Sequence, residues 1–164
     1  MMTAAWFSRV GQALDNDEKA RIVALLNGRS EAVAIEVVSG VALSRILLAE
    51  EHDNLWWDAE ESERERLWEI AAERATETDV AERLSASVEE GVFIRDAAAH
   101  VGNVAAIDPS HIPPAVEAAL LSLHQNALAE LVETPADHWF RIKHALFKSG
   151  RWPLGFRSGR LQIV

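Results

Sequence analysis

Apolar side chains recur every three to four positions over most of this sequence, the spacing that places them on one face of an α-helix. A short helix is predicted after Asp15, which can serve as its N-cap, with Asn27-Gly28 at its C-terminal end. Ser30 then begins a predicted long helix that reaches about Glu51 and is apolar on nearly all sides. A helix of that kind belongs in the centre of a helical bundle.

The same spacing predicts further helices separated by short breaks. A charged helix begins at Asp58, and its apolar stripe is formed by Leu67, Trp68, Ala71 and Ala75. Later helices are predicted over residues 78–90, 92–106, 114–133 and 135–148. Gly91 ends the first of these, and Thr134 provides the N-cap of the last.

The pattern changes after residue 149, where apolar residues flank a turn at Ser158-Gly159 in the manner of a β-hairpin. A lone hairpin is only marginally stable in water, so Trp152, Phe156 and Ile163 are expected to pack against helices. We therefore predict an all-α protein, a single-domain helical bundle of six or seven helices. Its helical body covers residues 1–149, and a short C-terminal β-hairpin-like tail covers residues 150–164.

Length and composition agree with one helical domain. The chain has 164 residues, of which 49% are hydrophobic, and this is enough for a cooperative core. It contains no cysteine, which excludes disulfides, thiolate metal sites and a cysteine nucleophile. Glu36 and Arg45 interrupt the most apolar stretch, which argues for a buried helix over a membrane span. We see no secretion signal and expect a cytoplasmic protein.

The net charge of −10 is distributed unevenly along the chain. Residues 138–164 carry six Lys or Arg and no acid, whereas residues 1–137 hold all 26 acids and only ten bases. Arg151, Arg157 and Arg160 are expected to pair with this acidic body; the alternative is a local site for phosphate or carboxylate. The overall charge argues against nucleic acid as a partner and favours a basic protein.

The densest acidic segment, residues 50–69, contains two adjacent tryptophans. Aromatic anchors surrounded by carboxylates are typical of a surface that steers and binds a cationic partner. The candidate partner-binding residues are Glu50, Glu51, Asp53, Trp56, Trp57, Asp58, Glu60 and Glu61. The alternative interpretation is a solvated helix face with two tryptophans in the core.

Motifs for enzymatic chemistry are weak in this sequence. The six histidines lack His-Glu-x-x-His and Glu-x-x-His spacing, and we predict no metal and no cofactor. Arg95 and His100, in the segment RDAAAH, resemble the Arg-x4-6-His signature of HEPN ribonucleases. That resemblance implies an arginine that holds phosphate and a histidine that acts in general acid–base cleavage of RNA. A helical ribonuclease using this pair is therefore one alternative.

The ending GRWPLGF, followed by GRLQIV, resembles the end of small bacterial toxin-immunity proteins. The resemblance implies a non-catalytic, antitoxin-like cytoplasmic protein that binds and blocks a cognate toxin. We therefore predict an interaction protein of this kind, with a basic toxin domain as its expected partner. A third alternative is a helical structural or oligomerisation subunit that forms a homo-oligomer through its tryptophan-rich surface.

Overall fold

The computed structural model describes residues 5–26, 34–39, 42–43, 45–46, 60–104, 108–157 and 159–164, with the backbone alone for 101–104. The helices are α1 (Asn16–Leu25), α3 (Glu60–Arg74), α4 (Glu77–Val104), the 3-10 helix η1 (Pro109–His111), α5 (Ile112–Leu131) and α6 (Trp139–Lys148). The strands are β1 (Ala34–Val37), β2 (Pro153–Arg157) and β3 (Arg160–Ile163). The described part of the chain thus has five α-helices of ten residues or more, and not the six or seven predicted.

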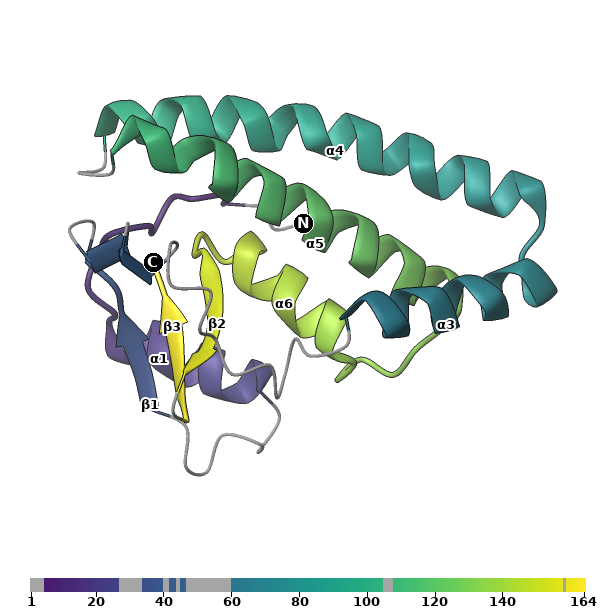
Figure 1. The fold of residues 1–164 in the computed structure, drawn as a ribbon, viewed down its shortest axis with the longest axis horizontal. Coiled ribbons are helices and arrows are strands. Elements are labelled where there is room, and N and C mark those ends of the chain that lie inside the picture. Colours follow the sequence, from purple (N-terminus) through teal and green to yellow (C-terminus); the bar gives the residue numbers. More distant parts are fainter. Residues whose placement is uncertain are drawn as a thin grey trace.

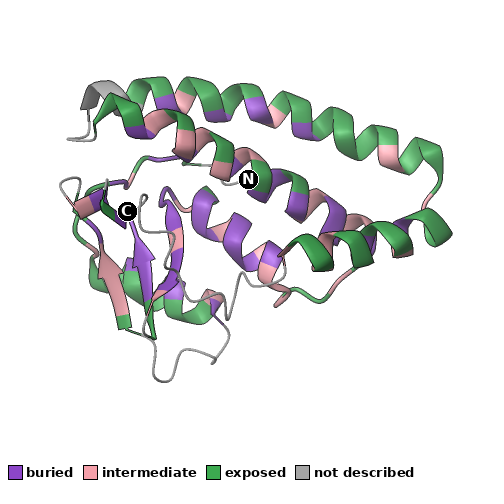
Figure 2. Ribbon diagram, viewed as in Figure 1, coloured by how far each residue is buried: buried purple, intermediate pink, exposed green. Residues whose placement is uncertain are grey.

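Helix α5 is the central helix of the fold. It packs against α3, α4 and α6, and α4 runs antiparallel beside it (Figure 1). Helix α6 leads into the hairpin of β2 and β3, and α1 packs against α6. Burial follows this arrangement, because α6 and the hairpin are largely buried while α3 and α4 expose their outer faces (Figure 2). A layer of long helices therefore lies beside a smaller part that contains the sheet.

Gly91 lies inside α4, so the prediction of two helices over 78–90 and 92–106 is wrong. This glycine is buried against α5, and a Cβ atom built on it would lie 3.2 Å from Leu120 Cδ2. A glycine in a helix interior costs about 1 kcal/mol relative to alanine. Here the missing side chain lets α4 and α5 approach each other closely.

Strand β1 lies where a long helix over residues 30–51 was predicted, so that prediction is wrong for this part of the chain. Ile35 of β1 pairs in parallel with Leu161 of β3, 126 positions later. A short apolar run does not by itself distinguish a buried helix from a strand, and here a distant partner strand decides. Residues 42–43 and 45–46 are helical, so the helix prediction holds there.

The C-terminal hairpin is present as predicted, and it forms two strands of a three-stranded sheet in the order β1-β3-β2. Because of this sheet, the described residues form a mostly helical fold with three strands, and not the all-α fold predicted. Phe156, Leu161 and Ile163 face a core cluster shared with α1 and α6. Trp152, Phe156 and Ile163 are each at most 3% exposed, which confirms that the hairpin packs on the helices.

Helix α6 begins at Trp139, four residues later than predicted. The Thr134 hydroxyl donates a 3.0 Å hydrogen bond to a backbone carbonyl near the end of α5 and does not cap α6. His138 is the N-cap instead, because its Nδ1 accepts a hydrogen bond from the backbone N–H of Phe140. Gly150, with φ of +98°, follows the end of the helix in the conformation that glycine adopts at helix C-termini.

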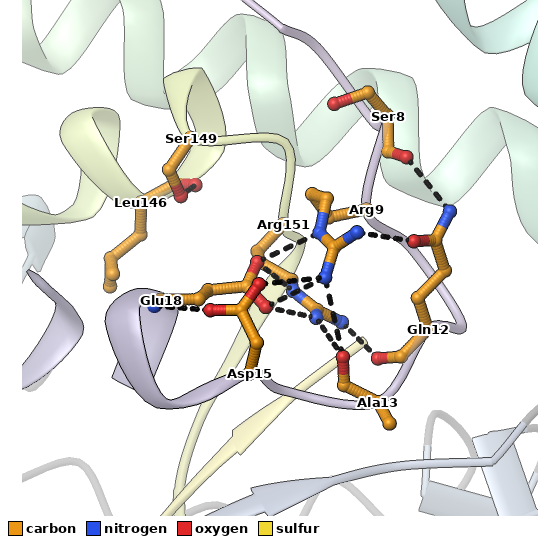
Figure 3. A network of polar contacts seen from close by, with 9 residues as sticks. All are labelled: Ser8, Arg9, Gln12, Ala13, Asp15, Glu18, Leu146, Ser149 and Arg151. Atoms are coloured by element: carbon orange, nitrogen blue, oxygen red, sulfur yellow. Dashed lines mark hydrogen bonds and ion pairs between the residues drawn. The ribbon is translucent and has the colours of Figure 1, made fainter. Parts of the chain in front are cut away.

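A buried ion pair joins the N-terminal segment to the residue that leads into β2 (Figure 3). The Arg151 guanidinium donates to both Glu18 carboxylate oxygens, at 2.6 and 2.9 Å, and to the carbonyls of Gln12 and Ala13. Arg9 donates to the same carboxylate at 3.2 Å. Arg151 is fully buried, so for this residue the predicted pairing with the acidic body is confirmed.

These contacts determine the ionisation of Glu18. Burial opposes the charged form and would raise the pKa of its carboxyl. Hydrogen bonds and charge from Arg151 and Arg9 outweigh burial and lower the pKa of Glu18 to about 2. The side chain is therefore ionised in the folded protein at neutral pH.

Candidate functional site

A groove of about 500 Å³ runs between α3, α4 and α5. Its apolar lining consists of Trp68, Val80, Leu84, Leu121, Ala127, Leu128 and Leu131. Trp68 and Leu84 are each 43% exposed and Leu121 is 38% exposed, so these large side chains remain open to water. The groove is therefore an exposed apolar surface between three packed helices.

The apolar surface extends beyond this groove. A second hollow between α3 and α4 shares Trp68, Val80 and Leu84 with the groove. Val88 and Val92 follow Leu84 at intervals of four along α4, and both are exposed. Residues four apart lie on the same side of a helix, so these valines continue the stripe. The groove and its extension are called the apolar groove below.

Glu65 lines the α3 side of the apolar groove, and it belongs to a row of carboxylates along the exposed face of that helix. Glu61, Glu65, Glu69 and Glu73 follow one another at intervals of four, and all four are exposed. Like charges at this spacing repel each other and weaken the helix by a few tenths of a kcal/mol per pair. A cationic partner would relieve this repulsion, so α3 offers it a row of negative charge.

The two arginines at the groove are already paired. Arg64 donates to Glu61 at 2.8 Å, and Arg83 donates to Glu130 of α5 at 2.8 Å. Glu65, Glu69 and Glu73 have no ion pair with another residue in the described part of the chain. The local electrostatics of this edge are therefore negative.

Helix α3 is held in place by ion pairs along its inner side. The Glu60 carboxylate accepts hydrogen bonds from Lys143 Nζ at 2.7 Å and from Gln125 Nε2 at 3.0 Å. Glu63 lies 2.8 Å from His138 Nε2 and also pairs with Arg66. The hydrogen bond from Arg66, followed by that from His138, lowers the pKa of Glu63 despite its partial burial.

The residues predicted to bind a partner are only partly within the described structure. Glu50, Glu51, Asp53, Trp56, Trp57 and Asp58 lie outside the described residues. Glu60 points inward to Lys143 and serves the packing of α3 on α5 and α6. Glu61 is exposed at the start of the acidic row. Of the predicted set, Glu61 thus has the surface position that partner binding requires.

The hydrophobic pattern of the sequence did not predict which large apolar residues are exposed in the apolar groove. Trp68 was assigned to the buried stripe of its helix with Leu67, yet Leu67 is fully buried and Trp68 is 43% exposed. Adjacent helical residues differ by about 100° in direction, so only one of such a pair can point to the centre of the core. The signal in the sequence was the adjacent pair Leu67 and Trp68, because only one of the two could face the core.

Arg95 and His100 are both exposed on α4. They are five positions apart, which places them about 140° apart around the helix axis. Neither lines the two hollows between α3, α4 and α5. The described structure therefore does not bring the pair together in a cleft, which the ribonuclease alternative requires.

No group of three or more His, Asp or Glu side chains among the described residues is arranged to hold a metal ion. Within the same residues, no helix combines the length and the apolarity needed to cross a bilayer.

The chain was also compared with known proteins. A scan against protein-family models, a search of curated proteins and a search of solved structures each found no match. The likeness of the C-terminal residues to immunity proteins therefore stays a prediction.

Proposed function

We propose that this chain is a non-catalytic protein-binding module of the immunity or antitoxin kind, which holds a basic partner in the apolar groove. The observation that carries the proposal is the open apolar surface formed by Trp68, Leu84 and Leu121 between three helices. Contiguous exposed apolar surface rimmed by polar residues marks interaction sites in globular proteins.

An amphipathic helix with basic residues along its sides fits the chemistry of the groove. Its apolar side chains would fill the hollow between α3, α4 and α5, which is a recurring mode of helix recognition. Its Lys and Arg residues would approach Glu65 at the groove and the row of carboxylates that continues from it along α3. Such charge complementarity speeds association and fixes the orientation of the partner.

A toxin is the class of partner that the C-terminal resemblance suggests. Carboxylates can take the place of phosphates in the basic cleft of a nuclease or nucleotide-binding domain, and so block it. The divergent positions of Arg95 and His100 on α4 lend no support to a ribonuclease. Inhibition of a toxin by binding would require only the apolar groove and the carboxylates on α3, and no catalytic residue.

The test is co-expression of this chain with the protein encoded beside its gene, using two variants of α4. Leu84 and Phe93 are both exposed apolar residues, nine positions apart, so they lie on opposite sides of the helix. Leu84→Lys places a charge in the groove and is expected to abolish both growth protection and the complex seen by size-exclusion chromatography. Phe93→Lys is the matched control and should retain both.

Other outcomes would redirect the proposal. The immunity function is contradicted if the wild-type chain neither protects cells nor forms a complex. Equal binding by the two variants would move the interface away from the groove. A concentration-dependent mass in light scattering that Leu84→Lys abolishes would favour the oligomerisation subunit.

A further inference from the structure

Helix α4 carries a row of side chains whose spacing is the same when it is read in either direction. The row consists of Glu77, Val80, Leu84, Val88, Val92 and Arg95. Its intervals are three, four, four, four and three residues, and such intervals keep side chains on one side of a helix. The 18 residues from Glu77 to Arg95 make five full turns. The two charged ends therefore project in the same direction, with apolar side chains between them.

The middle of this row is open to water. Val88 is 68% exposed and Val92 is 51% exposed, and the large side chain of Leu84 lies open beside them. Exposed valines do not favour a helix, because their χ1 rotation is restricted there. Contiguous apolar side chains on a surface mark a place where another surface packs.

The charges at the two ends of the row indicate what packs there. Glu77 and Arg95 are both exposed, and neither has an ion pair in the described part of the chain. A second α4 helix laid antiparallel over the row brings Glu77 of each copy beside Arg95 of the other. A parallel arrangement would bring like charges together at both ends, which opposes pairing.

The same antiparallel arrangement matches the apolar side chains. Because the intervals are symmetric, Leu84 of one copy meets Val88 of the other, and Val80 meets Val92. Each contact occurs twice, as in the interface of a dimer with twofold symmetry. The row is thus complementary to itself in both shape of pattern and charge.

We infer that a second copy of this chain docks on the exposed row, so that two α4 helices pair antiparallel about a twofold axis. Two chains with a net charge of −10 repel each other, and the pairing has to overcome this repulsion. Salt screens charges that are more than about 8 Å apart at physiological ionic strength, whereas the pairs at the ends of the row are in contact. An interface of one helix per copy is small, so the dimer is weak and reversible.

The pairing has a consequence for the apolar groove, and this step alone rests on the proposed function. Val80 and Leu84 also line the groove, so a second copy on α4 covers that side of it. A partner that enters the groove must displace the second copy. The free chain thereby keeps part of its apolar surface covered until the partner arrives.

Sedimentation equilibrium of the full chain tests the pairing, at chain concentrations from about 10 to about 500 µM, the range in which weak dimers form. The mass should rise from 18.1 kDa toward twice that value. Val88→Lys places a charge in the centre of the row and should abolish the rise. Phe93→Lys is the control, since Phe93 is also exposed but lies about 140° away around α4, and it should keep the rise.

A charge exchange tests the two ends of the row. Glu77→Arg and Arg95→Glu should each weaken association by about tenfold or more, because like charges then meet at both ends. Combining the two substitutions in one chain restores opposite charges and should recover the association of the wild-type chain. Glu82→Arg, at an exposed position about 140° away from Glu77, is the charge-matched control and should associate as the wild-type chain does.

Three results would overturn the pairing: a monomer at every concentration, unchanged association of Val88→Lys, or a double variant that associates no better than the single ones. Arg95→Glu separates this inference from the proposed function, because Arg95 lines neither hollow and its variant should lose pairing but keep growth protection. A monomeric wild-type chain that still protects cells overturns the pairing alone. A chain that pairs but gives no protection overturns the immunity function alone.

Discussion

Glu18 and Arg151 form a buried ion pair in which both carboxylate oxygens accept and all three guanidinium nitrogens donate. Removing two charges from water costs several kcal/mol per ion, and close contact and complete hydrogen bonding recover that cost. Such a pair adds little net stability compared with apolar side chains. It makes the fold sensitive to loss of one partner, because the remaining charge would stay buried alone.

Glu18→Gln is expected to lower the free energy of unfolding by about 3 kcal/mol, because Arg151 would keep its charge without a counterion. Urea denaturation at pH 7.5 measures this change. Asp17→Asn, at the exposed neighbouring position on α1, should change stability by less than about 1 kcal/mol. Equal losses in the two variants would contradict the role assigned to the buried pair.

At the scale of elements, local signals predicted the mostly helical character of the chain and the start of α1, but they missed features that depend on distant contacts. Asp15 was predicted as the N-cap of α1, and its Oδ1 accepts a 2.6 Å hydrogen bond from the Glu18 N–H. Strand β1 was missed because the residues it pairs with lie 126 positions later. Glu60 was placed on an exposed binding surface because its partner, Lys143, is 83 positions away. Short-range patterns contain no information about such partners.

Gly91 allows a test of how α4 and α5 fit together. Gly91→Ala is expected to stabilise the protein by up to about 1 kcal/mol, because alanine favours the helix and the Leu120 side chain is only partly buried and can shift. Gly91→Leu should destabilise it by about 1 to 3 kcal/mol through overpacking. Thermal unfolding of both variants measures these effects, and a stabilising leucine would show that the helices are not in close contact there.

At the scale of the whole molecule, the effect of acid on stability combines two groups whose pKa values are lowered in the folded protein. His144 is buried beside Trp6, at a ring-centroid distance of 5.6 Å. Burial, with a smaller contribution from the Lys148 charge, lowers the pKa of His144 to about 3. Glu18 has its pKa lowered to about 2 by Arg151 and Arg9. The folded protein therefore resists protonation at both positions.

Stability should fall in two stages as the pH decreases. Between pH 6.5 and 3 the unfolded chain takes up a proton at His144 that the folded chain does not, at about 1.4 kcal/mol per pH unit. Below pH 4.5 the Glu18 contribution is lost as well, down to pH 2. Urea midpoints at pH 7.5, 6 and 5 measure the first stage.

A His144→Leu variant should remove the loss between pH 6.5 and 5, about 2 kcal/mol in the wild-type chain. His124→Leu, on the exposed side of α5, should keep that loss. If both variants showed the same pH profile as the wild-type chain, His144 would not be the group responsible.

The 126 positions between β1 and its partner strand also govern the order of events during synthesis. At about 5 to 20 residues per second, a ribosome needs about 6 to 25 s to make the intervening chain. Helices α4 and α5 are close in sequence and can pair during that interval, whereas β1 remains without its ladder. During synthesis β1 therefore stays without its ladder until β3 has been made, so the sheet is the last part of the described fold to form.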